Sequence, residues 1–226
     1  MASISLHHHG QEREPVIVID GFTTDPDLWI EDAESLRYER IGDHYPGVRA
    51  VVPRRLVSVM ISRWADLIRE TFAIVDSLDR FDSFYSLVTT KPDALAPIQR
   101  LPHFDGVERD RIAILHFLGR EELGGTTFYR QRATGFETVD ASRLAAFSAA
   151  LRSEIDLRGL PPPRYVAGDT EIYEQVARYD ARFNRALIYR GHTLHCADIP
   201  DGLTLSSDPR SGRLTVNTFL KPGGIA

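Results

Sequence analysis

The sequence predicts a mainly β fold with flanking helices, in which a jelly-roll core is supported by N-terminal helices. Two observations lead to this prediction. From Phe81 onward, short strand-like runs follow one another, and the gaps between them are rich in Gly, Pro, Asp and Asn. Regular helices do not alternate with these runs, which disfavours a parallel α/β sheet. We therefore expect one domain over 15–226, with helical support over about 15–80 and the jelly roll over about 81–226.

The N-terminal part divides into four segments. Residues 1–14 are polar and lack periodicity despite three consecutive histidines, so they are predicted to be a loose terminus. The apolar run at 15–22 predicts a strand. Asp27 is expected to cap a short helix that ends near residue 38. Apolar residues at helical spacing over 55–72 predict the most strongly amphipathic helix of the chain.

The C-terminal part is predicted to be mostly strand. The strand-like runs cover 84–89, 111–118, 126–129, 173–179, 186–189, 193–197 and 214–220. One helix interrupts them. Asp140 can cap this helix, and its buried face is expected to consist of Leu144, Phe147, Leu151 and Ile155.

Composition excludes several classes of protein. The formal net charge is −5, and basic residues are scattered along the chain, whereas a nucleic-acid binder more often shows a basic stripe. No apolar run is long enough to cross a bilayer, and the N-terminus lacks the pattern of a signal peptide. A single cysteine, Cys196, rules out an internal disulfide framework. We therefore expect a cytoplasmic protein with no membrane or nucleic-acid partner. The oligomeric state stays open, a homodimer included.

The run His103-Phe104-Asp105 carries the first half of a predicted metal site. Alternate residues of an extended segment share a face, so the imidazole and the carboxylate point the same way. A second histidine far along the chain, His195, can complete a set of two imidazoles and one carboxylate. This facial triad is typical of non-haem iron(II) oxygenases, since it leaves open positions for a bidentate 2-oxo acid and for dioxygen.

Two choices in the second half stay open. His192 competes with His195 for the third ligand position, but His192 follows a glycine in a predicted turn, which favours His195. Arg213 begins the last apolar strand and shares a face with Thr215, so the pair can hold the distal carboxylate of 2-oxoglutarate. Arg210 lies close by in the sequence and is the alternative anchor.

These residues lie in a segment, 102–219, that resembles the double-stranded β-helix oxygenases dependent on iron(II) and 2-oxoglutarate, in particular their prolyl-hydroxylase-like branch. It is also similar to an uncharacterised bacterial family within that branch. The resemblance is carried by the runs LPHFD, RIAILHFLG, GGTTFYR, YRGHTLHCADI and RLTVNTFL. It implies His103, Asp105 and His195 as catalytic metal ligands and Arg213 as the co-substrate anchor. Related halogenases lack the carboxylate ligand, so Asp105 implies hydroxylation of a C–H bond with release of succinate and carbon dioxide.

Other functions remain as alternatives. One is a cupin-like metalloenzyme that does not use 2-oxoglutarate, and another is a non-catalytic jelly-roll binding module. The sequence does not identify the substrate, which is expected to be a small molecule, an amino acid or a peptide side chain. The long loops at 131–139, 157–170 and 201–211 are expected to surround the mouth of the site, because specificity is commonly carried by loops on a rigid scaffold.

Overall fold

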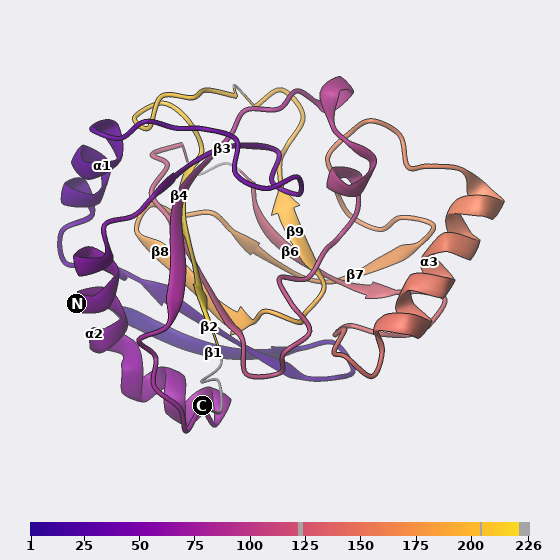
Figure 1. Ribbon diagram of the computed structural model, residues 1–226, viewed down its shortest axis with the longest axis horizontal. Coiled ribbons are helices and arrows are strands. Elements are labelled where there is room, and N and C mark those ends of the chain that lie inside the picture. Colours follow the sequence, from indigo (N-terminus) through magenta and orange to yellow (C-terminus); the bar gives the residue numbers. More distant parts are fainter. Residues whose placement is uncertain (122–123, 204, 222–226) are drawn as a thin grey trace.

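Two antiparallel sheets face each other in the computed structural model, which describes residues 1–121, 124–203 and 205–221 (Figure 1). Residues 222–226, the end of the expected domain, lie outside the described residues. The larger sheet has the strand order β1 (Ser3–His9), β2 (Glu14–Asp20), β8 (Arg185–Arg190), β5 (Ile112–Phe117), β10 (Leu214–Leu220), β4 (Phe81–Val88) and β3 (Gly47–Val51). The smaller sheet has the order β7 (Tyr173–Asp180), β6 (Gly125–Gln131) and β9 (His195–Asp198).

The path of the chain between the two sheets defines the fold. After β4 the chain passes through an isolated bridge between His103 and His195, which adds an edge segment to the smaller sheet beside β9. It then enters β5 in the larger sheet, β6 and β7 in the smaller, β8 in the larger, β9 in the smaller and β10 in the larger. This alternation is the topology of a double-stranded β-helix, so the predicted jelly-roll class is confirmed.

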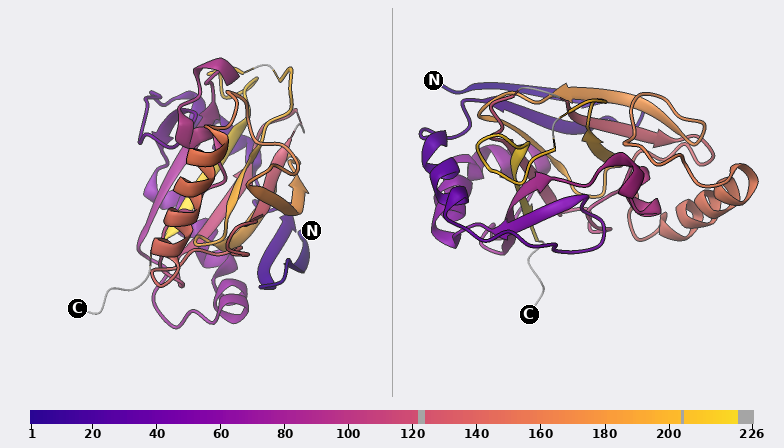
Figure 2. Two further views of the ribbon diagram at one scale, coloured as in Figure 1. Left: turned by 90° about the vertical axis from the view of Figure 1, so that its right-hand side faces the viewer. Right: turned by 90° about the horizontal axis from the view of Figure 1, so that it is seen from above.

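Helices α1 (Pro26–Glu34) and α2 (Arg54–Phe72) lie together on one side of the molecule, and α3 (Leu144–Arg158) lies at the opposite end (Figures 1 and 2). Within α2, Trp64, Ile68 and Phe72 are buried in a cluster with outward-facing strand residues such as Tyr85 and Val216. The alternation of the strands produces this arrangement, because one face of the larger sheet packs on the helices while the other faces the smaller sheet.

The helices differ from prediction at their ends. The carboxylate of Asp25, not that of Asp27, caps α1, accepting a hydrogen bond from the Leu28 backbone N–H at 3.1 Å, and the helix ends at Glu34 rather than near 38. The predicted cap of α3 is wrong as well: Arg143 occupies the N-cap position without a side-chain cap, and Asp140 instead accepts from the backbone N–H of Arg143 in the turn before the helix.

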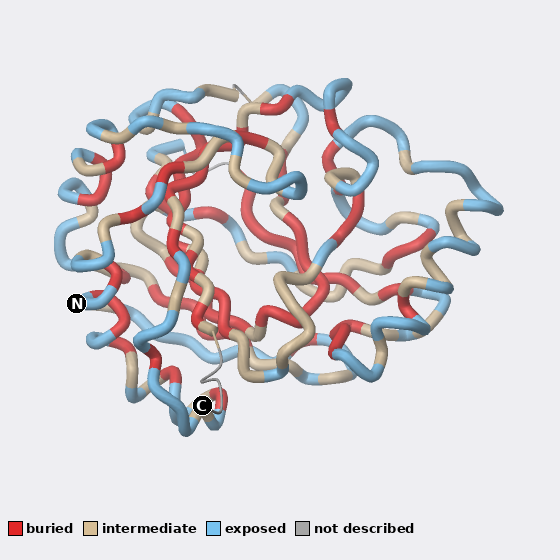
Figure 3. The backbone as a smooth tube through the Cα atoms, viewed as in Figure 1, coloured by how far each residue is buried: buried red, intermediate tan, exposed pale blue. Residues whose placement is uncertain are grey.

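The predicted buried face of α3 is only partly correct. Phe147 is buried and Leu151 and Ile155 pack partly against the same cluster, but Leu144 is 40% exposed. The outer side of α3 is open to solvent (Figure 3). The described residues contain no helix that is both long and apolar enough to cross a membrane.

The expected loose terminus at 1–14 is wrong. Residues 3–9 form β1, which pairs with β2 from Ser3 opposite Asp20 to His9 opposite Glu14. The backbone of β2 offers a free edge, and pairing there satisfies the N–H and C=O groups of β1. Only His9 is buried, with its ring centroid 4.7 Å from that of Phe128. Ile4 and Leu6 stay about half exposed, so backbone pairing rather than apolar burial holds this strand.

His116 on β5 points toward the helices and away from the space between the sheets. Its ring lies against Phe22 and Trp29, with ring centroids 5.0 and 5.9 Å away, and its Nε2 is 3.0 Å from Asn184 Oδ1. Burial lowers the pKa of His116 to about 4, although the contact with Asn184 acts in the opposite direction. The residue is thus a core histidine and not a ligand, as its alternation with Ile114 and Leu118 indicates.

The depressed pKa of His116 predicts a specific loss of stability in acid. Because the unfolded chain takes up a proton near pH 6.5 while folded His116 resists protonation until about pH 4, the unfolding free energy falls as pH drops through this window. The expected contribution is about 3 kcal/mol. Denaturant unfolding at several pH values should show a smaller acid loss for His116→Gln than for wild type. Equal losses in the two proteins would contradict the prediction.

Candidate metal centre

A reciprocal pair of backbone hydrogen bonds joins the two stretches that carry the predicted ligands. The His103 N–H donates to the His195 carbonyl and the His195 N–H donates to the His103 carbonyl, both at 2.8 Å. The Asp105 N–H donates to the carbonyl of Gly191 at 2.7 Å. These bonds place the two imidazoles side by side, with ring centroids 4.5 Å apart. Sequence regions separated by about 90 positions therefore meet at one edge of the smaller sheet.

Gly191 permits this close approach. A Cβ atom at this position would lie 2.9 Å from Cδ of Arg111 and 3.4 Å from Cβ of Asp105. The missing side chain lets the strand end that follows β8 come close to the segment of Asp105. The glycine before His192 thus has a structural role in positioning the carboxylate.

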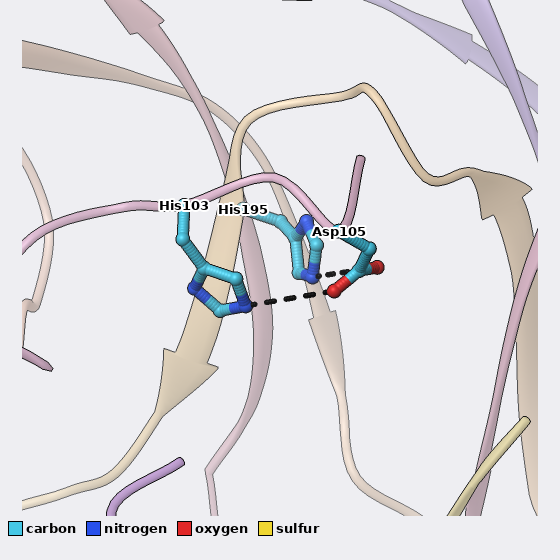
Figure 4. A group of neighbouring side chains, drawn as sticks. All are labelled: His103, Asp105 and His195. Carbon is cyan, nitrogen blue, oxygen red and sulfur yellow. Dashed lines mark ion pairs between the residues drawn. The ribbon is translucent and has the colours of Figure 1, made fainter. Parts of the chain in front are cut away.

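His103, Asp105 and His195 point toward one another (Figure 4). His103 Nε2 is 3.9 Å from Asp105 Oδ1, and His195 Nε2 is 3.7 Å from Asp105 Oδ2. Two donors that each lie about 2.1 Å from a shared ion are roughly 3 to 4 Å apart, depending on the angle between them. The spacing is too long for hydrogen bonds and suits an ion between the three groups.

The surroundings of the three side chains also fit a metal ion. His195 Nδ1 lies 2.9 Å from the Thr193 carbonyl oxygen, a contact that places the proton on Nδ1 and leaves the lone pair of Nε2 facing Asp105. Asp105 Oδ2 is inaccessible to solvent and makes no hydrogen bond. Burial raises the pKa of Asp105. A divalent cation would supply the partner that this carboxylate lacks.

Among the described residues, these three are the only set of His, Cys, Asp or Glu side chains with metal-binding spacing. His192, the alternative third ligand, is buried elsewhere, and its Nε2 lies 3.8 Å from Glu14 Oε1. The N-terminal histidines do not converge either, because His7 contacts Ser5 while His9 packs against Phe128. The structure therefore brings together the predicted set with His195.

A cavity of about 530 Å³ extends from the three side chains between the two sheets, and both Arg213 and Thr215 line it. Arg213 is 9% exposed and donates from Nη2 to the Gly125 carbonyl at 2.7 Å. Its Nε has no hydrogen bond, and it makes no ion pair with any residue of the described chain. Arg210, by contrast, lies at the surface, with Nη2 2.6 Å from Glu34 Oε2, and does not line the cavity.

The sequence did not indicate two further residues of this cavity, Tyr45 and Arg49. They lie on 41–49, a segment that contributes part of the wall, together with Tyr165 and Val166 from the expected loop at 157–170. The expected loops at 131–139 and 201–211 do not line it within the described residues, so that prediction is wrong for them. The only signal for Arg49 was a charged residue in the otherwise apolar run GVRAV, which forms the unpredicted edge strand β3.

Fold and site together define a double-stranded β-helix protein with a candidate centre of two histidines and one carboxylate. The chain belongs to DUF6445, a family of unknown function whose model matches residues 1–220. Comparison with the curated proteins found no match.

Several solved structures are similar to the chain. The non-heme alpha ketoglutarate dependent epimerase SnoN from nogalamycin biosynthesis is 14% identical, with 95% of this chain and 83% of that chain covered and a TM-score of 0.47. HygX from Streptomyces hygroscopicus, with nickel, 2-oxoglutarate and hygromycin B bound, is 12% identical over 92% and 82%, with a TM-score of 0.49. A Pseudomonas putida prolyl-4-hydroxylase is 11% identical over 99% and 93%, with a TM-score of 0.46. At these values the similarity concerns the fold and assigns no activity to this chain.

The centre predicts one metal-binding site per chain. Titration with Fe(II) under nitrogen, or with Mn(II) in air, should show one equivalent bound, and metal at a hundredfold excess over its Kd should raise the unfolding free energy by about 2.7 kcal/mol. His103→Ala and His195→Ala should lose both effects, because each removes one of three ligands.

A variant with His7→Ala and His8→Ala is the matched control, since it removes two exposed histidines near the N-terminus and should bind metal as wild type does. Loss of binding in this control, with retention in His195→Ala, would place the site elsewhere.

Proposed function

We propose that this chain is a non-haem oxygenase dependent on iron(II) and 2-oxoglutarate. In this proposal it hydroxylates an unactivated C–H bond of a small molecule, amino acid or peptide, and succinate and carbon dioxide are released. One observation carries the proposal: a single cavity holds three converging metal-ligand side chains and a buried guanidinium without an anionic partner in the described chain. A ferrous centre also fits the reducing cytoplasm expected from the sequence.

The ligand set favours iron(II) over the common structural metals. Two imidazoles and one carboxylate on one side of an ion leave open positions, whereas structural zinc sites are usually closed by four protein ligands. Bound iron(II) and 2-oxoglutarate would together activate dioxygen, which is the oxidant: one of its oxygen atoms would enter succinate and the other the hydroxylated product. The role of the chain is to hold the ligands, orient both substrates and exclude water.

Arg213 and Thr215 are proposed to bind the distal carboxylate of 2-oxoglutarate. Burying a cation away from water is costly unless an anion accompanies it, and Arg213 has no such partner among the described residues. Its guanidinium can donate a bidentate pair of hydrogen bonds to a carboxylate, and the Thr215 hydroxyl lines the same cavity. A cupin-like enzyme that does not use 2-oxoglutarate would leave this charge uncompensated.

Aromatic rings pack against His195 and hold it in place. The ring centroid of Tyr189 lies 4.9 Å from that of His195, in an edge-on arrangement, and that of Phe128 lies 6.0 Å away on another side. Burial and the charge of Asp105 raise the pKa of Tyr189 well above its usual value, so the phenol stays neutral beside the carboxylate. These rings limit the orientations available to His195, which preorganises the ligand for the ion.

Anaerobic addition of 2-oxoglutarate to the Fe(II) protein should produce a visible charge-transfer band whose titration gives the Kd. Arg213→Gln should weaken 2-oxoglutarate binding by about a hundredfold, because a buried charge-assisted pair contributes roughly 3 kcal/mol. Arg210→Gln is the matched control and should leave the Kd unchanged, since Arg210 pairs with Glu34 at the surface.

Asp105→Ala should abolish succinate formation from 2-oxoglutarate in air, because the carboxylate ligand is lost. If the iron-loaded wild type shows no band, or if Arg210→Gln weakens binding as much as Arg213→Gln does, the assignment of 2-oxoglutarate to this cavity is wrong.

A further inference from the structure

A second guanidinium, that of the half-buried Arg49, lines the same cavity. Arg49 on the edge strand β3 lies opposite Ser86 on β4, and Ser86 lies opposite Thr215 on β10. The three residues therefore form a row across neighbouring strands on the sheet face that looks toward the smaller sheet. Arg49 reaches the cavity from the side of β3, whereas Arg213 reaches it from the start of β10.

The guanidinium of Arg49 is held by its flat face. Its Cζ lies 4.1 Å from the ring centroid of Tyr45 and 5.5 Å from that of Phe84. Its Nε is inaccessible to solvent and makes no hydrogen bond, and no carboxylate pairs with Arg49 among the described residues. Stacked arginines present their N–H edge to a ligand, so this geometry suits bidentate binding of a planar anion.

Arg49 lines the same cavity as the metal ligands His103, Asp105 and His195. Arg213 lines this cavity too, but it lies directly before β10, whereas Arg49 lies on the edge strand β3. Anions bound to the two guanidiniums would therefore occupy different parts of the cavity.

The sum of the charges in the loaded cavity is positive by one, so one further negative charge would neutralise it. Iron(II), the carboxylate of Asp105 and the dianion of 2-oxoglutarate together carry one negative charge, which Arg213 neutralises. Two further charged residues line the cavity and are already compensated. Glu108 pairs with Arg111 through two hydrogen bonds of 2.9 Å, and Lys221 pairs with Asp82 at 2.6 Å. Arg49 remains as one uncompensated cation in the described part of the cavity, where a charge with little access to water favours a counter-ion.

Much of the remaining cavity wall is apolar. It includes Ile98, Phe104, Leu115, Phe147, Leu151 and Phe219. A ligand whose body is apolar would bury this surface, which is about 25 cal/mol favourable for each Å² removed from water. The wall and the single free cation therefore select for a molecule with one anionic end and an apolar body.

We propose that Arg49 is a substrate-binding residue and that it recognises the carboxylate of a small, largely apolar monocarboxylic acid. This inference rests on the proposed function, because it assigns the second substrate of the same site. A carboxylate matches both the fork of the guanidinium and the single uncompensated charge, whereas a phosphate monoester would bring nearly two negative charges.

The test compares the binding of acids with that of the corresponding amides, using protein whose redox-inactive metal prevents catalysis. Wild-type protein loaded with Zn(II), with and without 2-oxoglutarate, is titrated by calorimetry and ligand-observed NMR. The probes are hexanoate and hexanamide, 3-phenylpropanoate and 3-phenylpropanamide, and hexyl phosphate.

We expect each acid to bind at least tenfold more tightly than its amide and more tightly than the phosphate. Arg49→Gln should remove the difference between acid and amide, and Arg49→Lys should retain part of it, because lysine keeps the charge but not the fork.

Arg210→Gln is the matched control, since it removes a surface arginine that pairs with Glu34 and does not line the cavity, and it should keep the preference for acids. Unchanged thermal unfolding would show that the Arg49 variants are folded. The proposal is overturned if no acid binds more tightly than its amide, if the preference survives in Arg49→Gln, or if hexyl phosphate binds best.

The charge-transfer titration of the Fe(II) protein separates this proposal from the function on which it rests. Arg49→Gln should keep the wild-type Kd for 2-oxoglutarate, and a loss as large as that of Arg213→Gln would make Arg49 a co-substrate ligand instead. If wild type forms no charge-transfer band while the zinc protein still prefers acids in an Arg49-dependent manner, only the assignment of 2-oxoglutarate fails.

Discussion

The reciprocal hydrogen bonds between the backbones of His103 and His195 are the constraint on which the site depends. They make the segment after η2 (Pro97–Arg100) an edge segment of the smaller sheet, and they fix the two imidazoles next to each other. Asp105 follows through its own bond to Gly191, one pleat further along. Backbone bonds are stronger determinants of position here than side-chain contacts, because the three side chains make no hydrogen bonds to one another and meet only at ion-pair distances. Backbone pairing therefore brings the three ligand side chains together.

Buried positive charge is the second organising feature. A folded protein usually pairs its buried arginines, and this chain does so at Arg130 with Glu137 and at Arg185 with Asp20. Arg49 and Arg213 differ from these, since neither has an ion pair within the described part of the chain although both line one cavity. An unpaired arginine of this kind lowers the stability of the fold, and it is typical of binding sites, where an anionic ligand takes the place of the missing carboxylate. The two arginines approach the cavity from different strands, which allows two separate anions to be distinguished.

Much of the fold could be predicted because its signal is local. Short strand-like runs predicted β4, β5, β8 and β10, and helical spacing predicted α2 to within one residue at its start. Two strands, β1 and β3, were not predicted, and the reasons are physical. The strand β1 is exposed except at His9 and exists because β2 offers a free edge. The strand β3 is only five residues long and lies at the opposite edge of the sheet. Edge strands need little apolar surface, so hydrophobic alternation does not reveal them.

The candidate site was also partly determined by local sequence and partly by tertiary structure. The alternation of His103 and Asp105 about Phe104 follows from the two-residue period of extended backbone, so the sequence alone determined that these two side chains share a face. That His195 rather than His192 meets them, and that Arg213 rather than Arg210 enters the cavity, was decided by tertiary structure. Each rejected candidate lies only three positions from the residue that enters the site, but it contacts another part of the fold. His192 lies next to Glu14, and Arg210 forms an ion pair with Glu34. Arg49 shows the same limit more sharply, because its role arises from pairing between β3 and β4, and such pairing depends on contacts between segments distant in the sequence.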